Sequence, residues 1–362
     1  MKKYIILMLA LTTTFFVNAQ DVTEYGRNLT QYMSTPKFGA YFIGSYKVND
    51  DEEKNYGDGF NARLVRAYVD GSVLTDFKYR IQVELNKSVH LKDVFIEWTK
   101  YQEFRVKFGQ YKRIFTFEDP YNPWDVGVGD YSQLVKQLSG FSDYTAKEFN
   151  GSNGGRDIGL QFQGDFLPVS SDNHNLIHYQ VGVFNGQGIN VADADKYKDF
   201  MGTIQVQPLK DWYIGVFGWK GKYTANGITT DRNRLAFGTK YEHNGWTVRA
   251  EYGNHSGQKI SDYVINSLGE QELLPTASNG KADAWYATVG VPVTNWFKCY
   301  VKWDAYRIDK TNDNMKNIYS VCTNFQLHKN LMFQLQYNLV DDKLGVTDKT
   351  YNEFWVQTYI RF

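Results

Sequence analysis

The sequence is poor in cysteine, in proline and in long apolar runs. It has 2 cysteines and 7 prolines among 362 residues. After residue 19, no stretch approaches the ~20 consecutive apolar residues that a membrane-spanning helix needs. Cys299 and Cys322 fall on opposite faces of the strands expected around them, which disfavours a disulfide between them. Basic and acidic residues number 40 each, so no excess of positive charge suggests a nucleic-acid partner.

The N-terminus has the pattern of an export signal. Lys2 and Lys3 precede the apolar stretch from Ile5 to Val17, and Val17-Asn18-Ala19 fits a small-residue cleavage site. This order predicts a signal peptide at residues 1–19 and a mature domain at residues 20–362. The apolar stretch is too short for a membrane anchor.

Aromatic side chains are abundant, although the chain as a whole is hydrophilic. Phe, Trp and Tyr make up 17% of the residues, yet the mean hydropathy is −0.50. The apolar residues recur with period two, as in residues 77–86, where Phe77, Tyr79 and Ile81 alternate with Lys78, Arg80 and Gln82. A strand places each set on one face, whereas a helix would scatter both around its circumference.

About sixteen such runs follow one another along the chain. They lie at 37–48, 58–71, 75–86, 89–100, 103–112, 156–166, 175–185, 199–208, 211–221, 231–243, 245–254, 281–291, 295–309, 316–328, 330–340 and 350–362. Short connections alternate with longer ones, and the longer ones lie at 49–57, 113–155, 186–198, 222–230, 255–280, 310–315 and 341–349. The connection at 87–88 is the exception, because it is brief where a long loop is expected.

This pattern predicts an all-β fold, a transmembrane antiparallel β-barrel. Short turns on the periplasmic side, long loops outside and an even strand number are typical of barrels in the bacterial outer membrane. A sheet can cross lipid only when it closes on itself, and about sixteen strands enclose a lumen too wide for side chains to fill. We therefore expect a water-filled channel for small hydrophilic solutes, surrounded by outer-membrane lipid. A soluble β-sandwich, the competing fold, would not need the loop asymmetry.

Basic residues recur on the faces expected to point into the lumen. Same-parity basic residues form rows that lower the barrier for anions. The residues expected to form this anion path are Arg105, Lys107, Arg232, Arg234, Lys240, Arg249, Lys298 and Lys302. Acidic residues share these faces, among them Glu84, Glu97, Glu242, Glu251 and Asp304. A neutral lumen in which the charges pair is thus the alternative.

The longest connection, residues 113–155, is expected to fold inward as the third external loop and to narrow the pore. Connections of this length without secondary structure are usually functional or disordered. Lys136 and Lys147 would then face permeating anions. The alternative is a solvated loop of mixed charge, because the segment also contains acidic residues such as Glu118, Asp130 and Asp143.

Three segments resemble the phosphate-selective porin family. They are FRVKFGQYK at 104–112, GRDIGLQF at 155–162 and YQVGVFNG at 179–186. The resemblance implies a sixteen-stranded homotrimer that passes phosphate or other anions. Arg232 and Arg234 resemble part of the family's arginine ladder, and Arg63 and Arg66 look like a thinned version of its other basic strand. The loop at 113–155 departs from the family's pattern because it is acidic as well as basic.

Two other functions remain open from the sequence. A barrel enzyme such as a lipid hydrolase needs a nucleophile and a base within hydrogen-bond reach, but the six histidines show no catalytic motif and no zinc spacing. We therefore expect no catalytic residues, metal or cofactor. A non-conducting structural barrel is the second alternative, and bilayer conductance would distinguish it from a channel.

Overall fold

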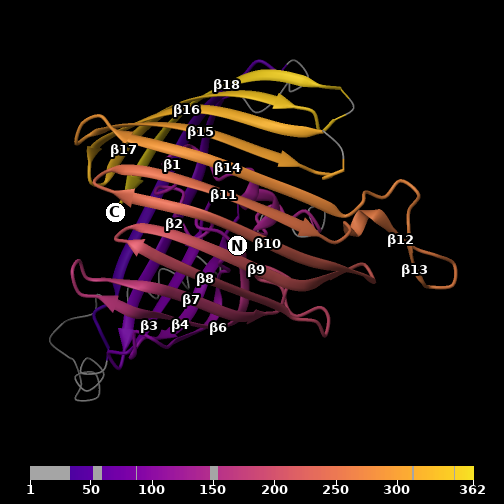
Figure 1. Cartoon of the computed structure of the whole chain (residues 1–362), viewed down its shortest axis with the longest axis horizontal. Coiled ribbons are helices and arrows are strands. Elements are labelled where there is room, and N and C mark those ends of the chain that lie inside the picture. The colour runs from indigo at the N-terminus through magenta and orange to yellow at the C-terminus, as the bar shows by residue number, and fades with distance from the viewer. Residues whose placement is uncertain (1–32, 52–58, 87, 147–153, 312–313, 346) are drawn as a thin grey trace, which may run out of the picture.

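The computed structural model describes residues 33–51, 59–86, 88–146, 154–311, 314–345 and 347–362. Within these residues, sixteen antiparallel strands form one closed barrel, in which the first strand, β1, pairs with the last, β18 (Figure 1). The barrel strands are β1 (Lys37–Asn49), β2 (Gly59–Val73), β3 (Phe77–Glu84), β4 (His90–Trp98), β5 (Arg105–Lys112), β6 (Arg156–Val169), β7 (His174–Phe184), β8 (Asp199–Leu209), β9 (Trp212–Ala225), β10 (Ile228–His243), β11 (Trp246–Ser256), β14 (Lys281–Pro292), β15 (Phe297–Arg307), β16 (Met315–His328), β17 (Leu331–Asp342) and β18 (Lys349–Arg361). The expected all-β barrel is confirmed. No helix of the described residues is long and apolar enough to cross a membrane.

The strands form because apolar and polar residues alternate, and the barrel separates the two sets. On β10, Arg232, Arg234 and Ala236 are buried inside, whereas Leu235 and Phe237 are exposed on the outer wall. Because β1 and β18 close the ring, neither leaves an unpaired edge. An apolar outer wall with no free backbone groups is what a sheet needs in order to lie in lipid.

The two cysteines lie on neighbouring strands but face opposite ways. Cys322 is buried inside and sits opposite Tyr300, while Cys299 sits opposite Thr323. Both thiols are free, as their parity predicted.

One connection differs from the prediction made for it. Residues 222–230 were expected to form a long loop, but β9 runs to Ala225 and β10 starts at Ile228. Asn226 and Gly227 form the turn, with φ values of 51° and 77°. An Asn-Gly pair with both φ angles positive is the preferred two-residue hairpin turn, so this signal outweighs the polar composition of the segment.

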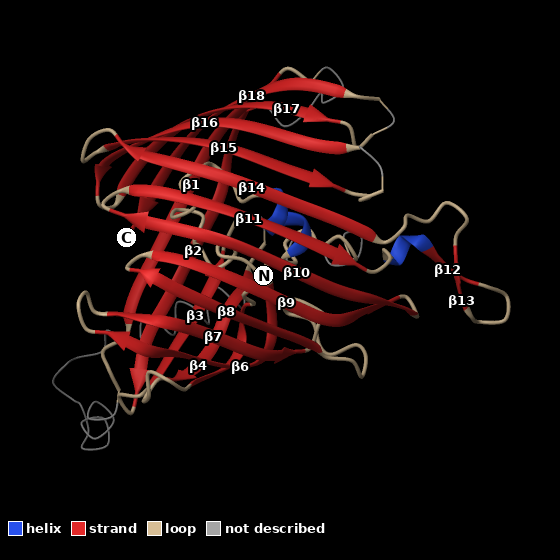
Figure 2. Ribbon diagram, viewed as in Figure 1, coloured by secondary structure: helices blue, strands red, loops and turns tan. Residues whose placement is uncertain are grey.

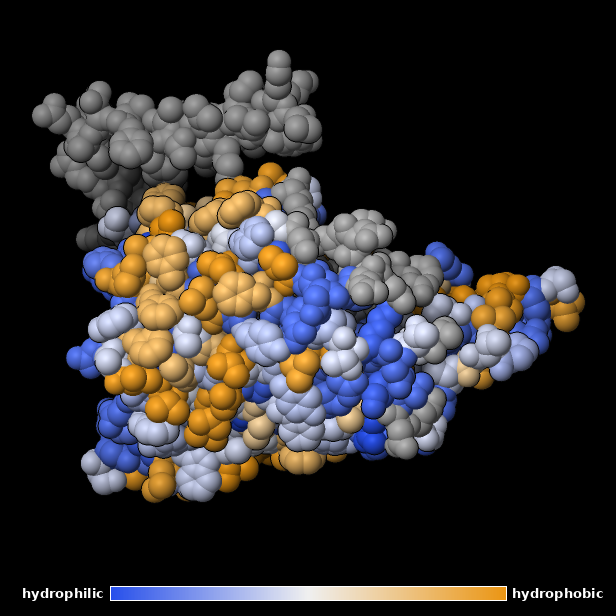
Figure 3. Space-filling view, turned by 90° about the horizontal axis from the view of Figure 1, so that it is seen from above, coloured by the Kyte–Doolittle hydropathy of each residue, from blue (hydrophilic) through white to orange (hydrophobic). Residues whose placement is uncertain are grey.

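The two ends of the barrel differ. Apolar side chains cover much of the wall toward the end with the short turns, and hydrophilic side chains gather toward the long loops (Figure 3). The connection after β11 contains a short 3-10 helix, η2 (Ile260–Asp262), and a hairpin of β12 (Tyr263–Ile265) and β13 (Gln271–Leu273). This hairpin projects beyond the barrel (Figure 1), and the alternation of residues did not predict it.

The connection between β5 and β6, which we call the constriction loop (residues 113–155), folds into the barrel as expected. Its described part, 113–146 and 154–155, includes a short π-helix, η1 (Leu134–Leu138), which lies within the ring of strands (Figure 2). Leu134, Val135 and Leu138 of this helix are buried. The loop is therefore packed against the wall and is not a solvated surface segment.

Candidate pore and its constriction loop

Buried ion pairs hold the constriction loop where it leaves β5 and again beyond η1. Arg113 Nη1 lies 3.0 Å from Asp157 of β6 and 3.6 Å from Asp199 of β8. Farther along the loop, Asp143 lies 2.8 Å from Arg234 Nη2 and 3.4 Å from Arg232 Nη1. We call this set the ionic clamp, and it consists of Arg113, Asp143, Asp157, Asp199, Arg232 and Arg234, the last two on β10.

The side chains of the ionic clamp are buried, so each of their charges needs a partner of opposite charge. Arg232 also donates to Asp199 and to the carbonyl of Gly186, and Arg234 donates to the carbonyl of Leu138. Removing one member of a buried pair leaves an uncompensated charge, at a cost of about 3–5 kcal/mol. The clamp therefore fixes the position of the loop.

Uncharged amides hold the middle of the loop against the opposite wall. The carbonyl of Gly127 accepts hydrogen bonds from Asn324 and Gln334, at 2.8 and 3.2 Å. The N–H of Gly129 donates to Gln336 at 2.6 Å. A Cβ at Gly129 would lie 2.5 Å from the Gln357 amide and 2.8 Å from the Trp355 ring, so any other residue would force these side chains of β18 to shift.

Apolar packing fills the space between the loop and the strands from β8 to β14. Phe117 contacts Phe217 edge-on, with ring centroids 5.1 Å apart, and Phe115 contacts Trp219 in the same way. Leu134 and Leu138 of η1 belong to the same buried cluster. This part of the lumen is a hydrophobic core, and water is excluded from it.

Two wall carboxylates accept hydrogen bonds from the loop backbone. Glu251 of β11 accepts from the N–H groups of Phe117 and Glu118, at 2.6 and 3.0 Å. Asp304 of β15 accepts from the N–H of Gln133 at 2.9 Å. From the sequence, both residues were expected only as counter-charges in the lumen.

Four of the eight basic residues expected in the anion path lie beneath the loop. Arg232, Arg234, Arg249 and Lys302 are 0%, 4%, 1% and 6% exposed. Arg249 donates to the carbonyl of Val126 and stacks on Tyr121, and Lys302 lies 3.5 Å from Glu118. All four face inward as expected, but each contacts the loop.

The other four basic residues lie on less buried parts of the inner wall. Arg105 is paired with Asp165 of β6. Lys107, Lys240 and Lys298 have no carboxylate within 4.0 Å in the described part of the chain, and each ammonium lies near aromatic rings. These contacts are 3.8 Å from Lys107 to Phe95, 4.7 Å from Lys240 to Tyr213 and 4.8 Å from Lys298 to Tyr300. Aromatic faces stabilise a cation without neutralising it, so these three ammonium groups are not held in ion pairs.

Of the two lysines expected on the loop, only Lys136 lies within the described residues. Lys136 lies on η1, where its ammonium is 2.8 Å from Asp130, which also pairs with Arg63 at 3.0 Å. The neighbouring cations lower the pKa of Asp130 despite its burial. Lys147 lies outside the described residues.

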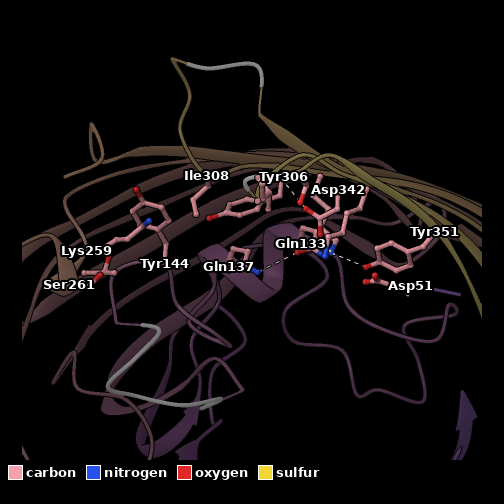
Figure 4. A pocket seen from close by; sticks show the side chains of 16 residues that line it. Asp51, Gln133, Gln137, Tyr144, Lys259, Ser261, Tyr306, Ile308, Asp342 and Tyr351 are labelled. Carbon is pink, nitrogen blue, oxygen red and sulfur yellow. Dashed lines mark hydrogen bonds and ion pairs between the residues drawn. The ribbon is translucent and has the colours of Figure 1, made fainter. Parts of the chain in front are cut away.

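Cavities remain on both sides of the loop. On the external side, one of about 520 Å³ lies between η1 and the wall, lined by Gln133, Gln137, Tyr306 and Tyr351 (Figure 4). It shares Gln133, Lys316 and Tyr351 with a deeper cavity of about 250 Å³ that also touches Tyr131. Three further cavities, which we call the inner cavities, touch the loop or lie at the short-turn end. They have volumes of about 200 Å³ beside Pro120 and Tyr121, about 560 Å³ beside Trp124 and about 470 Å³ beside His174.

Tyr131 separates the outer cavities from one of the inner cavities. Its ring lines the deeper outer cavity. Its hydroxyl donates to the carbonyl of Tyr121 and accepts from Lys112 at 3.1 Å, and both of these residues line the inner cavity of about 200 Å³. The Tyr131 side chain thus lies between the linings of these two cavities.

The inner and outer cavities differ in charge. Outer cavities mix both signs, with bases Lys47, Lys136, Lys259, Lys302, Lys316 and Lys349 against acids Asp51, Asp130, Asp304, Asp342 and Glu353. Inner cavities are mainly basic, with Arg66, Arg80, Lys107, Lys112, Arg156, Lys210, Lys240, Arg249 and Lys298 against Asp93, Asp125, Asp165 and Asp211. The excess of basic residues therefore lies on the short-turn side of the loop.

Asp119 of the loop is buried without a hydrogen-bond partner for either carboxylate oxygen in the described residues. Burial raises its pKa to about 7, although Lys112 and Arg113 oppose the shift. In the sequence Asp119 is only one of several acidic residues of the loop, because nothing in its surroundings along the chain indicates burial.

Comparison with known proteins supports the fold assignment. No family model and no curated protein matches the chain. Among solved structures, the anion-selective porin of Comamonas acidovorans is 12% identical, with a TM-score of 0.66 over 91% of this chain and 100% of that chain. The outer-membrane channel DcaP of Acinetobacter baumannii is 11% identical, with a TM-score of 0.63 over 92% of this chain and 98% of that one.

A further structure, the trimer form of OmpT, an outer-membrane protein of Vibrio cholerae, is 13% identical, with a TM-score of 0.61 over 91% of this chain and 99% of that chain. At these identities the likeness is one of fold. The chain has the sixteen-stranded barrel fold seen in bacterial outer-membrane porins.

Proposed function

We propose that the protein is an outer-membrane channel that passes small hydrophilic solutes by passive diffusion and prefers anions. Residues 1–19 direct export, the mature chain lies in the outer membrane, and three copies associate as a homotrimer. Phosphate is one candidate anion, because the sequence resembles the phosphate-selective porin family.

One observation carries the anion preference. Lys107, Lys240 and Lys298 face the inner lumen, and none has a carboxylate within 4.0 Å among the described residues. Charges within a low-dielectric, narrow lumen are poorly screened compared with charges on an open surface. An anion that reaches the inner cavities meets cations that have no carboxylate in ion-pair contact among the described residues.

The proposal assigns a different role to the basic residues under the loop. Arg232, Arg234, Arg249 and Lys302 hold the constriction loop in place and thereby set the width of the path. Arg105 remains in the proposed anion path, where Asp165 offsets its charge. Lys136 and Lys147 belong to the loop that anions pass.

The reversal potential across a planar bilayer under a salt gradient tests this proposal. We expect the sign that indicates anion preference, and a smaller magnitude when Lys107, Lys240 and Lys298 are all replaced by glutamine. Replacing Lys196, Lys220 and Lys329, which are exposed, removes the same charge and should leave the reversal potential unchanged. Cation preference in the unaltered protein would contradict the anion assignment while leaving the channel intact.

A further inference from the structure

The inner cavity beside Pro120 and Tyr121 combines cations with an apolar wall. It has a volume of about 200 Å³, enough for a small organic molecule. Its lining comprises the cations Arg66, Arg80, Lys107, Lys112 and Arg156, the rings Tyr41, Phe95, Tyr111 and Tyr121, the apolar residues Ile114 and Pro120, and Gln82, Asp93 and Asn122. We call it the ring-lined cavity.

Three of the five cations in this cavity already have their hydrogen bonds satisfied by the protein. Lys112 donates to the carbonyls of Asp119 and Tyr121, at 2.6 and 2.8 Å. Arg66 pairs with Glu84 at 2.7 Å. Arg156 binds both oxygens of Asp93, at 2.8 and 2.9 Å.

Lys107 differs from these three. No hydrogen bond or ion pair of its ammonium exists in the described residues, and the nitrogen lies 3.8 Å from the Phe95 ring centroid and 4.7 Å from that of Tyr111. Glu97 sits opposite Lys107 in the register of β4 and β5, but its carboxylate accepts from Gln163 at 2.5 Å. Lys107 therefore has donors free for a solute.

Arg80 is the second cation available to a solute. Its Nε and Nη2 donate to the two carboxylate oxygens of Asp70, both at 2.7 Å. Its Nη1 has no hydrogen bond in the described residues, and more than a third of its side chain is exposed. Together Lys107 and Arg80 place a positive charge at one side of the cavity, while Ile114, Pro120 and Tyr121 of the constriction loop provide apolar surface. A compact inorganic anion would use the cations and leave this apolar surface in contact with water, at a cost proportional to its area.

We propose that the ring-lined cavity binds carboxylate anions that carry a flat apolar body, of which benzoate is the simplest probe. The carboxylate accepts from Lys107 and Arg80, and the ring lies against the loop side chains. The inference rests on the proposed function, because solutes reach the cavity through the lumen. It specifies aromatic carboxylates among the anions that the channel would pass.

Equilibrium dialysis of labelled benzoate against the purified full-length protein tests the site directly. We expect benzoate to bind more tightly than acetate or inorganic phosphate, and Lys107→Gln to weaken binding about tenfold, as the loss of one charge-assisted hydrogen bond does. Lys329→Gln removes the same charge from an exposed turn and should leave binding unchanged. Glu97→Gln, which removes the nearby carboxylate, should tighten it and provides a second readout if Lys107→Gln does not fold.

The same probe in a bilayer separates the two proposals. Benzoate should reduce the chloride current at concentrations at which acetate does not, and Lys107→Gln should remove this effect. A protein that conducts but binds benzoate no better than acetate overturns the site and leaves the channel standing. A protein that binds benzoate through Lys107 but never conducts supports the site and overturns the proposed channel.

Discussion

Inside this barrel, three arginines and two lysines illustrate two different roles for a basic residue. Arg113, Arg232 and Arg234 each pair with buried carboxylates and fix the constriction loop, as the planar, multidentate guanidinium suits. Lys107 and Lys240 lie against aromatic rings without a carboxylate partner within 4.0 Å in the described residues. The inward basic residues that the sequence grouped into one row thus separate into structural and accessible sets.

Asp119 makes stability depend on pH. Its carboxyl has a pKa of about 7 in the folded chain and an ordinary value of 3.8. Between these values the folded protein holds a proton that the unfolded chain has lost, so rising pH lowers stability from about pH 4 to pH 7. We expect Asp119→Asn to be more stable than the unaltered protein at pH 8, on the order of a few kcal/mol, and to lose part of this pH dependence.

Thermal unfolding in detergent at pH 4.5 and pH 8 measures this difference. Asp348→Asn, which alters an exposed loop aspartate, is the control and should keep the pH dependence of the unaltered protein. If Asp119→Asn kept the same pH dependence of stability as the unaltered protein, Asp119 would not be the responsible group.

At the scale of elements, the constriction loop is attached to the wall by three kinds of contact. The ionic clamp holds the residues at 113 and 143, amides of β16, β17 and β18 hold Gly127 and Gly129, and aromatic packing holds Phe115 and Phe117. Because these contacts lie on strands far apart in the sequence, the loop position depends on the closed barrel.

Asp143→Asn should release the loop without unfolding the barrel. The substitution leaves Arg232 and Arg234 short of one carboxylate, and breaking a buried pair costs about 3–5 kcal/mol. Asparagine tolerates the positive φ of 38° at this position, so the backbone itself is not strained. We expect larger and noisier single-channel currents, recorded in planar bilayers.

Asp231→Asn is the matched control for this experiment. It breaks an ion pair with Lys222 in which both side chains are exposed, next to Arg232 in the chain, and exposed pairs contribute little. Currents in Asp143→Asn that match those of this control would show that the clamp does not hold the loop.

The elements differ in how well the sequence predicted them. Period-two alternation placed all sixteen barrel strands, and the boundaries of the constriction loop at Lys112 and Arg156 agree with the structure. The turn at Asn226 and Gly227 was missed, although its residue pair was visible. The hairpin of β12 and β13 and the helix η1 are too short to produce a periodic signal.

At the scale of the whole molecule, the alternation of residues along each strand predicted the closed barrel, but it did not predict which side chains fill the lumen. Parity showed that Arg232 and Arg249 face inward, yet only the folded loop shows that they are buried. The burial of Phe115 and Leu138 depends on contacts with β9 to β14 that no local pattern encodes. Long-range packing therefore decides which inward residues a solute can reach.

The central claim is that this barrel encloses a conducting path beside the constriction loop. Single-channel recording of the purified, folded protein in a planar bilayer tests it most directly. Our account predicts discrete current steps that increase linearly with voltage. Correctly folded protein that inserts into the bilayer and yields no steps would contradict it.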